Sequence, residues 1–282
     1  MSFQIKSSQK SFDGIQGVYS HQSLAAKCEM EFSVYVPEQA KEKPHPVLFY
    51  LSGLTCTQDN VTTKSGFQQA ASQLGVIVVC PDTSPRHSDH PMEHDHYDFG
   101  SGAGFYVNAT QKPWSENYQM YDYVATELPE LIAEHFPIDA TRMGIFGHSM
   151  GGHGALTIGL KHPDIFKSIS AFSPIVAPMQ CPWGQNAFSG YLGNNKNDWK
   201  SYDATQLIYD GYTSKNSILI DQGDADDFLS EQLKPELFET ACKKRGQALT
   251  LRLQSGFDHS YYFISSFMQE HVEFHASNLT IN

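Results

Sequence analysis

The stretch from Arg142 to Gly152 constrains the fold of this chain more than any other. Its first half, RMGIF, has the apolar character of a short strand, and a helix-compatible run follows Gly151 at once. The sequence Gly-His-Ser-Met-Gly between them predicts a sharp strand-to-helix turn, an elbow that lifts one hydroxyl out of a sheet. Glycines are needed on both sides because the backbone passes too close for side chains. Ser149 is therefore the candidate nucleophile.

Strand-like and helix-like runs alternate along most of the chain. Antiparallel opening strands are expected within 15–36, and further strands at 46–51, 75–80, 142–146, 167–172, 217–222 and 248–254. Helices are expected near 59–73, at 116–136 with a kink at Pro129, after the elbow, within 175–215, at 229–245 and at the C-terminal end. This alternation predicts an α/β fold, with a mainly parallel central sheet and helices on both faces.

Three loops that follow predicted strands carry the residue types of a catalytic triad. They are the elbow with Ser149, the acidic loop 223–227 and the loop 255–259. Active groups of such sheets gather on loops at the carboxyl ends of the strands, and the order Ser, Asp, His is that of α/β-hydrolases. His259 would accept the Ser149 proton and later return it to the leaving group, while an aspartate would hold the imidazole tautomer.

The identity of that aspartate stays open on the residues alone. Asp221 falls within the predicted strand, whereas Asp224, Asp226 and Asp227 all follow it in the loop. A turn-forming contact is a structural alternative for Asp224, and capping of the next helix is one for Asp227.

Composition narrows the class of partner. The formal charge of −12 argues against a nucleic-acid or anionic-membrane surface, since both require clustered Lys and Arg. No apolar run approaches the length of a membrane span, and the first residues lack the apolar core of a secretory signal, so we expect a soluble, cytoplasmic protein. Five cysteines without a C-x-x-C spacing indicate reduced thiols. The expected partner is a small molecule.

Residues 84–112 form a long polar, glycine-rich excursion, and long loops inside compact domains are commonly functional. Its glycines at 100–104 lack the flanking strand and helix of a dinucleotide site, which indicates a flexible or closely packed loop. Histidines and acids within 87–96 could coordinate a metal, but their spacing fits no standard zinc pattern, so we expect a solvated loop and no metal. The chain contains no linker or fixed repeat, which predicts a single domain over 1–282.

Seven motifs occur together along the chain: Leu51–Thr57, Pro81–Arg86, Gly147–Gly154, Cys181–Gly184, Phe188–Gly193, Ile220–Gly223 and Asp258–Ile264. Together they resemble the S-formylglutathione hydrolase, or esterase D, family, and the resemblance covers essentially the whole chain. It implies an α/β-hydrolase fold, a homodimer, and hydrolysis of S-formylglutathione to glutathione and formate in formaldehyde detoxification. The histidine content of the loop at 87–96 departs from the family pattern.

The resemblance also assigns site residues by position. It places the nucleophile on Ser149, the base on His259 and the acid on Asp226. The oxyanion-hole donors fall on the backbone N–H groups of Leu54 and Met150. These positions agree with the general rule of one donor after the nucleophile and one from the loop after an earlier strand.

Two further residues are candidates for the substrate pocket. Cys56 lies two residues beyond Leu54, and its structural alternative is a small buried hydrophobe. Trp183 is a candidate wall of the acyl pocket or of the leaving-group cleft, and an ordinary core tryptophan is its alternative.

The expected chemistry is that of a serine thioesterase with a formyl-Ser149 intermediate and no metal or organic cofactor. A general short-chain carboxylesterase, or a related acyltransferase, would use the same triad on oxoesters. A non-enzymatic binding protein of this fold would be expected to lack a triad member, and all three are present here.

Overall fold

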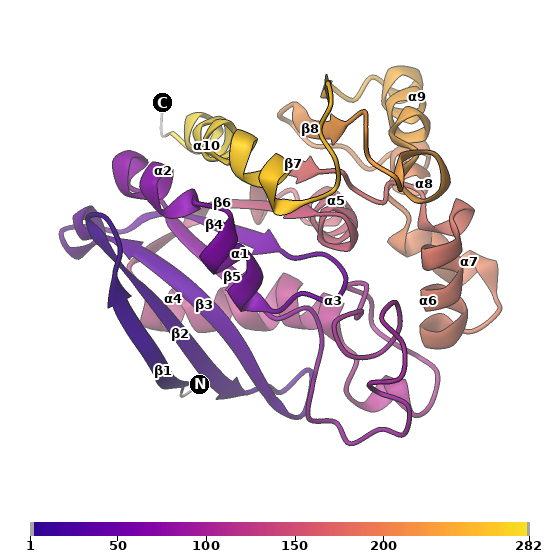
Figure 1. Cartoon of the computed structure of the whole chain (residues 1–282), viewed down its shortest axis with the longest axis horizontal. Coiled ribbons are helices and arrows are strands. Elements are labelled where there is room, and N and C mark those ends of the chain that lie inside the picture. The colour runs from indigo at the N-terminus through magenta and orange to yellow at the C-terminus, as the bar shows by residue number, and fades with distance from the viewer. Residues whose placement is uncertain (1–2, 281–282) are drawn as a thin grey trace.

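The computed structural model describes residues 3–280, which form one nine-stranded sheet in the order β1-β2-β3-β5-β4-β6-β7-β8-β9 (Figure 1). The strands are β1 (Phe3–Lys10), β2 (Gly14–Gln22), β3 (Glu29–Pro37), β4 (His45–Leu51), β5 (Ile77–Pro81), β6 (Ile138–His148), β7 (Phe166–Phe172), β8 (Ile218–Gly223) and β9 (Leu249–Gln254). The pairs among β1, β2, β3 and β5 are antiparallel, and every pair from β5 to β9 is parallel. The predicted α/β fold with a mainly parallel sheet is confirmed.

Helices cover both faces of this sheet. They are α1 (Gln58–Lys64), α2 (Phe67–Leu74), α3 (Met120–Asp122), α4 (Leu128–His135), α5 (Met150–Lys161), α6 (Pro182–Leu192), α7 (Lys196–Trp199), α8 (Ala204–Tyr209), α9 (Pro235–Arg245) and α10 (Tyr261–Asn278). Figure 1 shows α1, α2 and α10 in front of the sheet and α4 and α5 behind it. Among residues 3–280, no helix combines the length and apolarity needed to cross a membrane.

Strand β4 shows how the sequence builds two cores. All of its residues are buried, and they contribute alternately to the two faces. Val47, Phe49 and Leu51 join the apolar cluster behind the sheet, whereas Leu48 and Tyr50 join the one under α1, α2 and α10. A period of two follows from the pleat of a strand, and the unbroken apolar run follows from cover on both faces.

The structure contains one strand that the sequence did not indicate. β1 pairs with β2 at the edge of the sheet, and most of its residues are exposed or half-buried. Its sequence, FQIKSSQK, is polar because an edge strand buries little, so it lacks the apolar signature that marks the inner strands.

Helix interruptions account for the other differences from the sequence predictions. The helix expected near 59–73 is two helices, because Gly66 between them adopts a left-handed φ of 72°. The helix expected from 116 begins only at α3, and a π turn precedes Pro129, which cannot donate the hydrogen bond of a continuous helix. Lys234, with φ of 51°, separates a π turn from α9, where one helix was expected.

The long loop 84–112 contains no helix or strand, and its two halves differ: residues 87–96 are mostly exposed, as expected of a solvated loop, whereas residues 100–109 are mostly buried. The Glu93 side chain is 2% exposed and accepts hydrogen bonds from the hydroxyls of Ser88 and Tyr118. Gly102 has φ of 76° and lies against the backbone of Thr55, so a side chain there would be both strained and crowded. The glycines therefore serve close packing, one of the two alternatives expected from the sequence.

Candidate active site

Ser149 occupies a strained turn between β6 and α5. Its φ and ψ are 57° and −118°, a region that non-glycine residues rarely adopt. The turn is held by a hydrogen bond from the Ser149 N–H to Phe172 O, 3.0 Å long. A side-chain carbon on Gly151 would collide with Leu51 O, which explains the glycine there. The sequence Gly-His-Ser-Met-Gly thus forms the elbow that the pattern predicts.

Asp226 and His259 are joined at the carboxyl end of the sheet. Asp226 Oδ2 lies 2.6 Å from His259 Nδ1, and Asp226 Oδ1 accepts the Phe228 N–H at 2.9 Å. Burial alone would raise the pKa of the Asp226 carboxyl, but the hydrogen bond and charge of His259 outweigh it and lower that pKa. An ionised carboxylate on Nδ1 holds the proton there and leaves Nε2 free to accept one.

The neighbouring aspartates have other contacts. Asp224 Oδ1 accepts the Gly256 N–H at 2.6 Å, a contact between two loops 32 positions apart and not the local turn contact considered for it. Asp227 is exposed, and the capping role considered for it is not seen, because the π turn Leu229–Leu233 has no side-chain cap. Asp221 is fully buried and pairs with Arg252 at 2.5 Å. Of the four candidates, the structure brings Asp226 to the imidazole.

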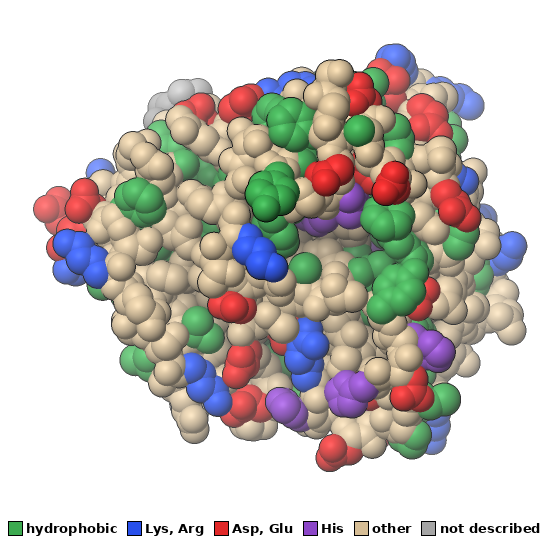
Figure 2. Space-filling view, viewed as in Figure 1, with side chains coloured by type: hydrophobic (Ala, Val, Ile, Leu, Met, Phe, Trp, Pro, Cys, Tyr) green, Lys and Arg blue, Asp and Glu red, His purple; other side chains and the backbone are tan. Residues whose placement is uncertain are grey.

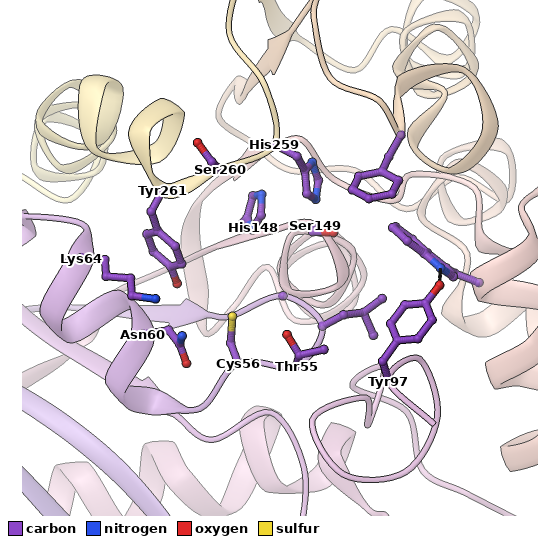
Figure 3. Close-up of a pocket in the computed structure, with 14 residues that line it drawn as sticks. Thr55, Cys56, Asn60, Lys64, Tyr97, His148, Ser149, His259, Ser260 and Tyr261 are labelled. Atoms are coloured by element: carbon purple, nitrogen blue, oxygen red, sulfur yellow. Dashed lines mark hydrogen bonds between the residues drawn. The ribbon is translucent and has the colours of Figure 1, made fainter. Parts of the chain in front are cut away.

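The His259 ring is held between two other rings. Its centroid lies 4.3 Å from that of His148 and 5.0 Å from that of Phe228. Burial, and then the neighbouring His259, lower the pKa of His148 well below its usual value, so His148 is neutral and adds no competing charge. Figure 3 shows the His259 ring directly above Ser149 in the view.

A cleft of about 360 Å³ opens above the elbow. It is lined by Ser149 and His259, by the segment Gly53–Cys56 after β4, by Asn60 and Lys64 of α1, and by Tyr97, His148, Trp183, Phe228, Ser260 and Tyr261. Figure 2 shows the hollow, with histidine at its depth, hydrophobic side chains around it, acidic side chains along its upper rim and a basic side chain at another rim. The volume suits a small molecule.

The proposed oxyanion donors lie beside this cleft. Leu54 is half-buried and lines it, and within residues 3–280 its N–H has no hydrogen-bond partner. Met150 is fully buried, but it is the first residue of α5, where backbone N–H groups have no partner within the helix. Both amides are therefore available to an oxyanion formed at Ser149.

Cys56 and Trp183 both line the cleft, as the sequence interpretation allowed. Burial raises the pKa of the Cys56 thiol, so this cysteine is uncharged at neutral pH. Trp183 Nε1 donates a 3.0 Å hydrogen bond to the hydroxyl of Tyr97, and its ring lies 4.7 Å from that of Phe228. Trp183 is thus held at the cleft between Tyr97 of the long loop and Phe228.

Several lining residues have no motif that marks them in the sequence. Asn60 and Lys64 stand on α1, and ordinary helix patterns do not reveal that they face a cleft. Tyr97 belongs to the long loop 84–112, and the length of this loop was the only sequence feature that suggested a functional role for it. Phe228 follows Asp226 by two residues.

The histidine-rich part of the loop forms no metal centre within the described chain. Among residues 3–280, no group of three or more His, Cys, Asp or Glu side chains is arranged to hold a metal ion. His90 packs instead against Trp114 and Tyr118, with ring centroids 5.6 and 6.3 Å apart.

Comparisons with known proteins agree with this geometry. The esterase family model, described as "Putative esterase", matches residues 23–274. S-formylglutathione hydrolases from Mus musculus and Bos taurus are 54% and 51% identical to the chain, each over 97% of both proteins. The chain belongs to the S-formylglutathione hydrolase family of esterases.

Solved structures extend the likeness to three dimensions. An S-formylglutathione hydrolase from Agrobacterium tumefaciens superposes with a TM-score of 0.96 at 54% identity, over 98% of this chain and 99% of that one. FphF, a serine hydrolase of Staphylococcus aureus, has a TM-score of 0.74 at 19% identity, over 93% and 98% of the two chains. The second likeness shows the fold alone.

Proposed function

We propose that this chain hydrolyses S-formylglutathione to glutathione and formate, as a serine thioesterase acting in formaldehyde detoxification. The observation that carries this proposal is identity of about half the residues, over nearly the whole chain, to enzymes named S-formylglutathione hydrolase. The linked Asp226–His259 pair beside the elbow serine supports it with the geometry of an acyl-transfer site.

In the proposed mechanism, Ser149 Oγ attacks the formyl carbon while His259 Nε2 takes the hydroxyl proton. The carbonyl oxygen becomes an oxyanion, which the Leu54 and Met150 N–H groups stabilise. The C–S bond then breaks and the glutathione sulfur leaves, as a thiolate or with the proton from His259. Water attacks the formyl-Ser149 ester with His259 as base, and collapse of the second oxyanion releases formate and restores the serine.

Asp226 determines which nitrogen of the His259 ring accepts the serine proton. Its 2.6 Å contact with Nδ1 keeps the proton on that nitrogen and stabilises the imidazolium formed in each half-reaction. The neutral His148 and the Phe228 ring limit rotation of the imidazole, which supports the orientation of Nε2 toward Ser149.

The alternative is general carboxylesterase activity on short-chain oxoesters. The decisive experiment compares kcat/KM for S-formylglutathione with kcat/KM for a matched short oxoester such as 4-nitrophenyl acetate. The proposal expects a strong preference for the glutathione thioester and a steep fall from formyl to acetyl to longer thioesters, because an overfilled pocket displaces the carbonyl from its donors. Comparable values across acyl lengths, with no preference for glutathione, would contradict it.

The proposal includes a single domain that forms a homodimer and works in the cytoplasm. The five cysteines are free thiols, and four of them are buried, which fits a reducing compartment. The dimer follows from the family resemblance, and light scattering on the purified protein is the test of it.

A further inference from the structure

The proposed substrate poses an electrostatic problem for this protein. Glutathione carries two carboxylates and one ammonium, so its thioester is a net anion, while the chain has a formal charge of −12. Long-range steering therefore works against the encounter. Recognition of the leaving group has to come from a favourable charge inside the cleft itself.

The cleft lining contains one such charge. Among the residues that line it, Lys64 is the sole lysine or arginine, and none is an aspartate or glutamate. Lys64 is exposed at the end of α1, and its Nζ lies 5.8 Å from the centre of the Tyr261 ring. Within residues 3–280, Lys64 takes part in no ion pair, so no carboxylate of the described chain neutralises it.

Asn60 lies on the same helix, one turn before Lys64, and adds a neutral donor. Its side-chain oxygen accepts the Thr57 N–H at 2.9 Å in the capping box of α1. Because this contact fixes which way the amide points, the Asn60 NH₂ group is left without a partner among the described residues and faces away from the cap. Figure 3 shows Asn60 and Lys64 together at one end of the cleft, with Ser149 between them and Tyr97.

We propose that Lys64, with Asn60 beside it, binds a carboxylate of the glutathione leaving group. This inference rests on the proposed function and deepens it by assigning the anion subsite. An ammonium and an amide donor form charge-assisted hydrogen bonds with a carboxylate, and the Tyr261 ring lies within cation–π distance of the ammonium. The subsite raises selectivity for anionic thioesters over neutral esters that react at the same serine.

The experiment measures the selectivity ratio, kcat/KM for S-formylglutathione divided by kcat/KM for 4-nitrophenyl acetate, in Lys64→Met and Lys64→Glu. Methionine keeps an unbranched, apolar side chain at this position and removes the charge. We expect the ratio to fall about tenfold in Lys64→Met and further in Lys64→Glu, mainly through KM, because the contact exists in ground and transition states alike. Lys244→Met is the matched control, since Lys244 also lies in the last turn of a helix, 5.5 Å from a tyrosine ring.

Two substrate analogues identify the carboxylate. One carries an amide in place of the glycine carboxylate, and the other carries 4-aminobutyryl in place of γ-glutamyl. The analogue that lacks the bound carboxylate should lower kcat/KM in wild-type protein. The same analogue should leave kcat/KM of Lys64→Met almost unchanged, because that variant no longer binds the carboxylate. The subsite would be overturned if the selectivity ratio stayed unchanged in both Lys64 variants. It would also be overturned if the ratio fell no further in Lys64→Met than in Lys244→Met. A wild-type enzyme without preference for S-formylglutathione would instead refute the function itself.

Discussion

Residues 3–280 contain two Ser–His–Asp clusters, which differ in their access to solvent and in the orientation of the imidazole. One is Ser149, His259 and Asp226 on loops at the carboxyl ends of the strands, beside the cleft. The other lies between α10 and strands β7 and β8, where three side chains are fully buried: Ser170, His271 and Asp221. Ser170 Oγ lies 2.8 Å from His271 Nδ1, and His271 Nε2 lies 3.1 Å from Asp221 Oδ2.

The imidazole faces opposite ways in the two sets. At the cleft the aspartate contacts Nδ1, which leaves Nε2 for the proposed proton transfer, whereas in the buried set the serine contacts Nδ1. Ser170 also shares its hydroxyl with His275 Nε2 at 2.8 Å, and it sits within a regular strand rather than on an elbow. The buried set thus lacks the elbow, the open cleft and the free ring nitrogen on which we base the proposal that Ser149 is the nucleophile.

The buried set has a structural consequence instead. Burial alone would raise the pKa of Asp221, but its hydrogen bonds to His271 and Arg252 outweigh it and lower that pKa to about 2. The network ties α10 to two strands, and α10 begins directly after His259 and Ser260. It thereby supports the loop that carries the proposed base.

Ser149→Ala gives the largest expected effect on activity. The change removes the nucleophile, so kcat should fall by about four orders of magnitude or more, while the thermal midpoint stays close to wild type. Stopped assays with S-formylglutathione and thermal unfolding check both parts. Substantial turnover by folded Ser149→Ala protein would place the nucleophile elsewhere.

Asp226→Asn should come next, with a fall in kcat of about 10³ to 10⁴, because the amide no longer holds the His259 tautomer. Asp224→Asn and Asp227→Asn are the matched controls on the same loop, and both should stay within a few-fold of wild type. A crippling effect of either control, with Asp226→Asn active, would move the acid to that residue.

Asp221→Asn is the counterpart in the buried set and should act on stability rather than chemistry. It leaves His271 and half-exposed Arg252 with a weaker partner, and we expect a loss of about 2 kcal/mol in the free energy of unfolding. Urea unfolding measures this loss, and kcat per folded molecule should change less than fivefold. A kcat loss comparable to that of Asp226→Asn would show that the buried set takes part in catalysis.

The smallest expected effect is a change in how the free energy of unfolding depends on pH, caused by the buried histidines of α10. Burial lowers the pKa of His271 and His275 below the ordinary 6.5, so both stay neutral in the folded chain while the unfolded chain takes up protons. Stability is therefore fully present above pH 6.5 and falls as the pH drops below it. His275→Gln should flatten this fall by about 1 kcal/mol between pH 6.5 and 5.5 in urea titrations. Equal slopes in wild type and variant would contradict the assignment.

The parts of the fold and of the candidate site that depend on local sequence patterns could be predicted from the sequence. The buried strands have continuous apolar runs, so the sheet could be predicted from short segments. The elbow has the Gly-x-Ser-x-Gly spacing between a strand and a helix, and His259 lies in the loop after the last predicted strand, so both residues could be proposed from local sequence. The choice among aspartates did not, because three of them fall within four residues of one loop and only the path of the turn decides which meets the ring.

Other features depend on contacts between distant segments. Ser170 and His271 are 101 positions apart, and a histidine on the last helix carries no local sign that it is buried. Lys64 likewise looks like an ordinary exposed residue at a helix end until the cleft beside it is seen. Polar side chains of this kind are placed by tertiary packing, which neither periodicity nor spacing encodes.

Labelling with a fluorophosphonate, followed by peptide mass spectrometry, tests most directly which of the two serines is the nucleophile. The reagent phosphonylates an activated serine, so wild-type and Ser170→Ala proteins should each take up one equivalent on the peptide that contains Ser149, and Ser149→Ala should take up none. Label on Ser170, or stoichiometric label in Ser149→Ala, would contradict the account.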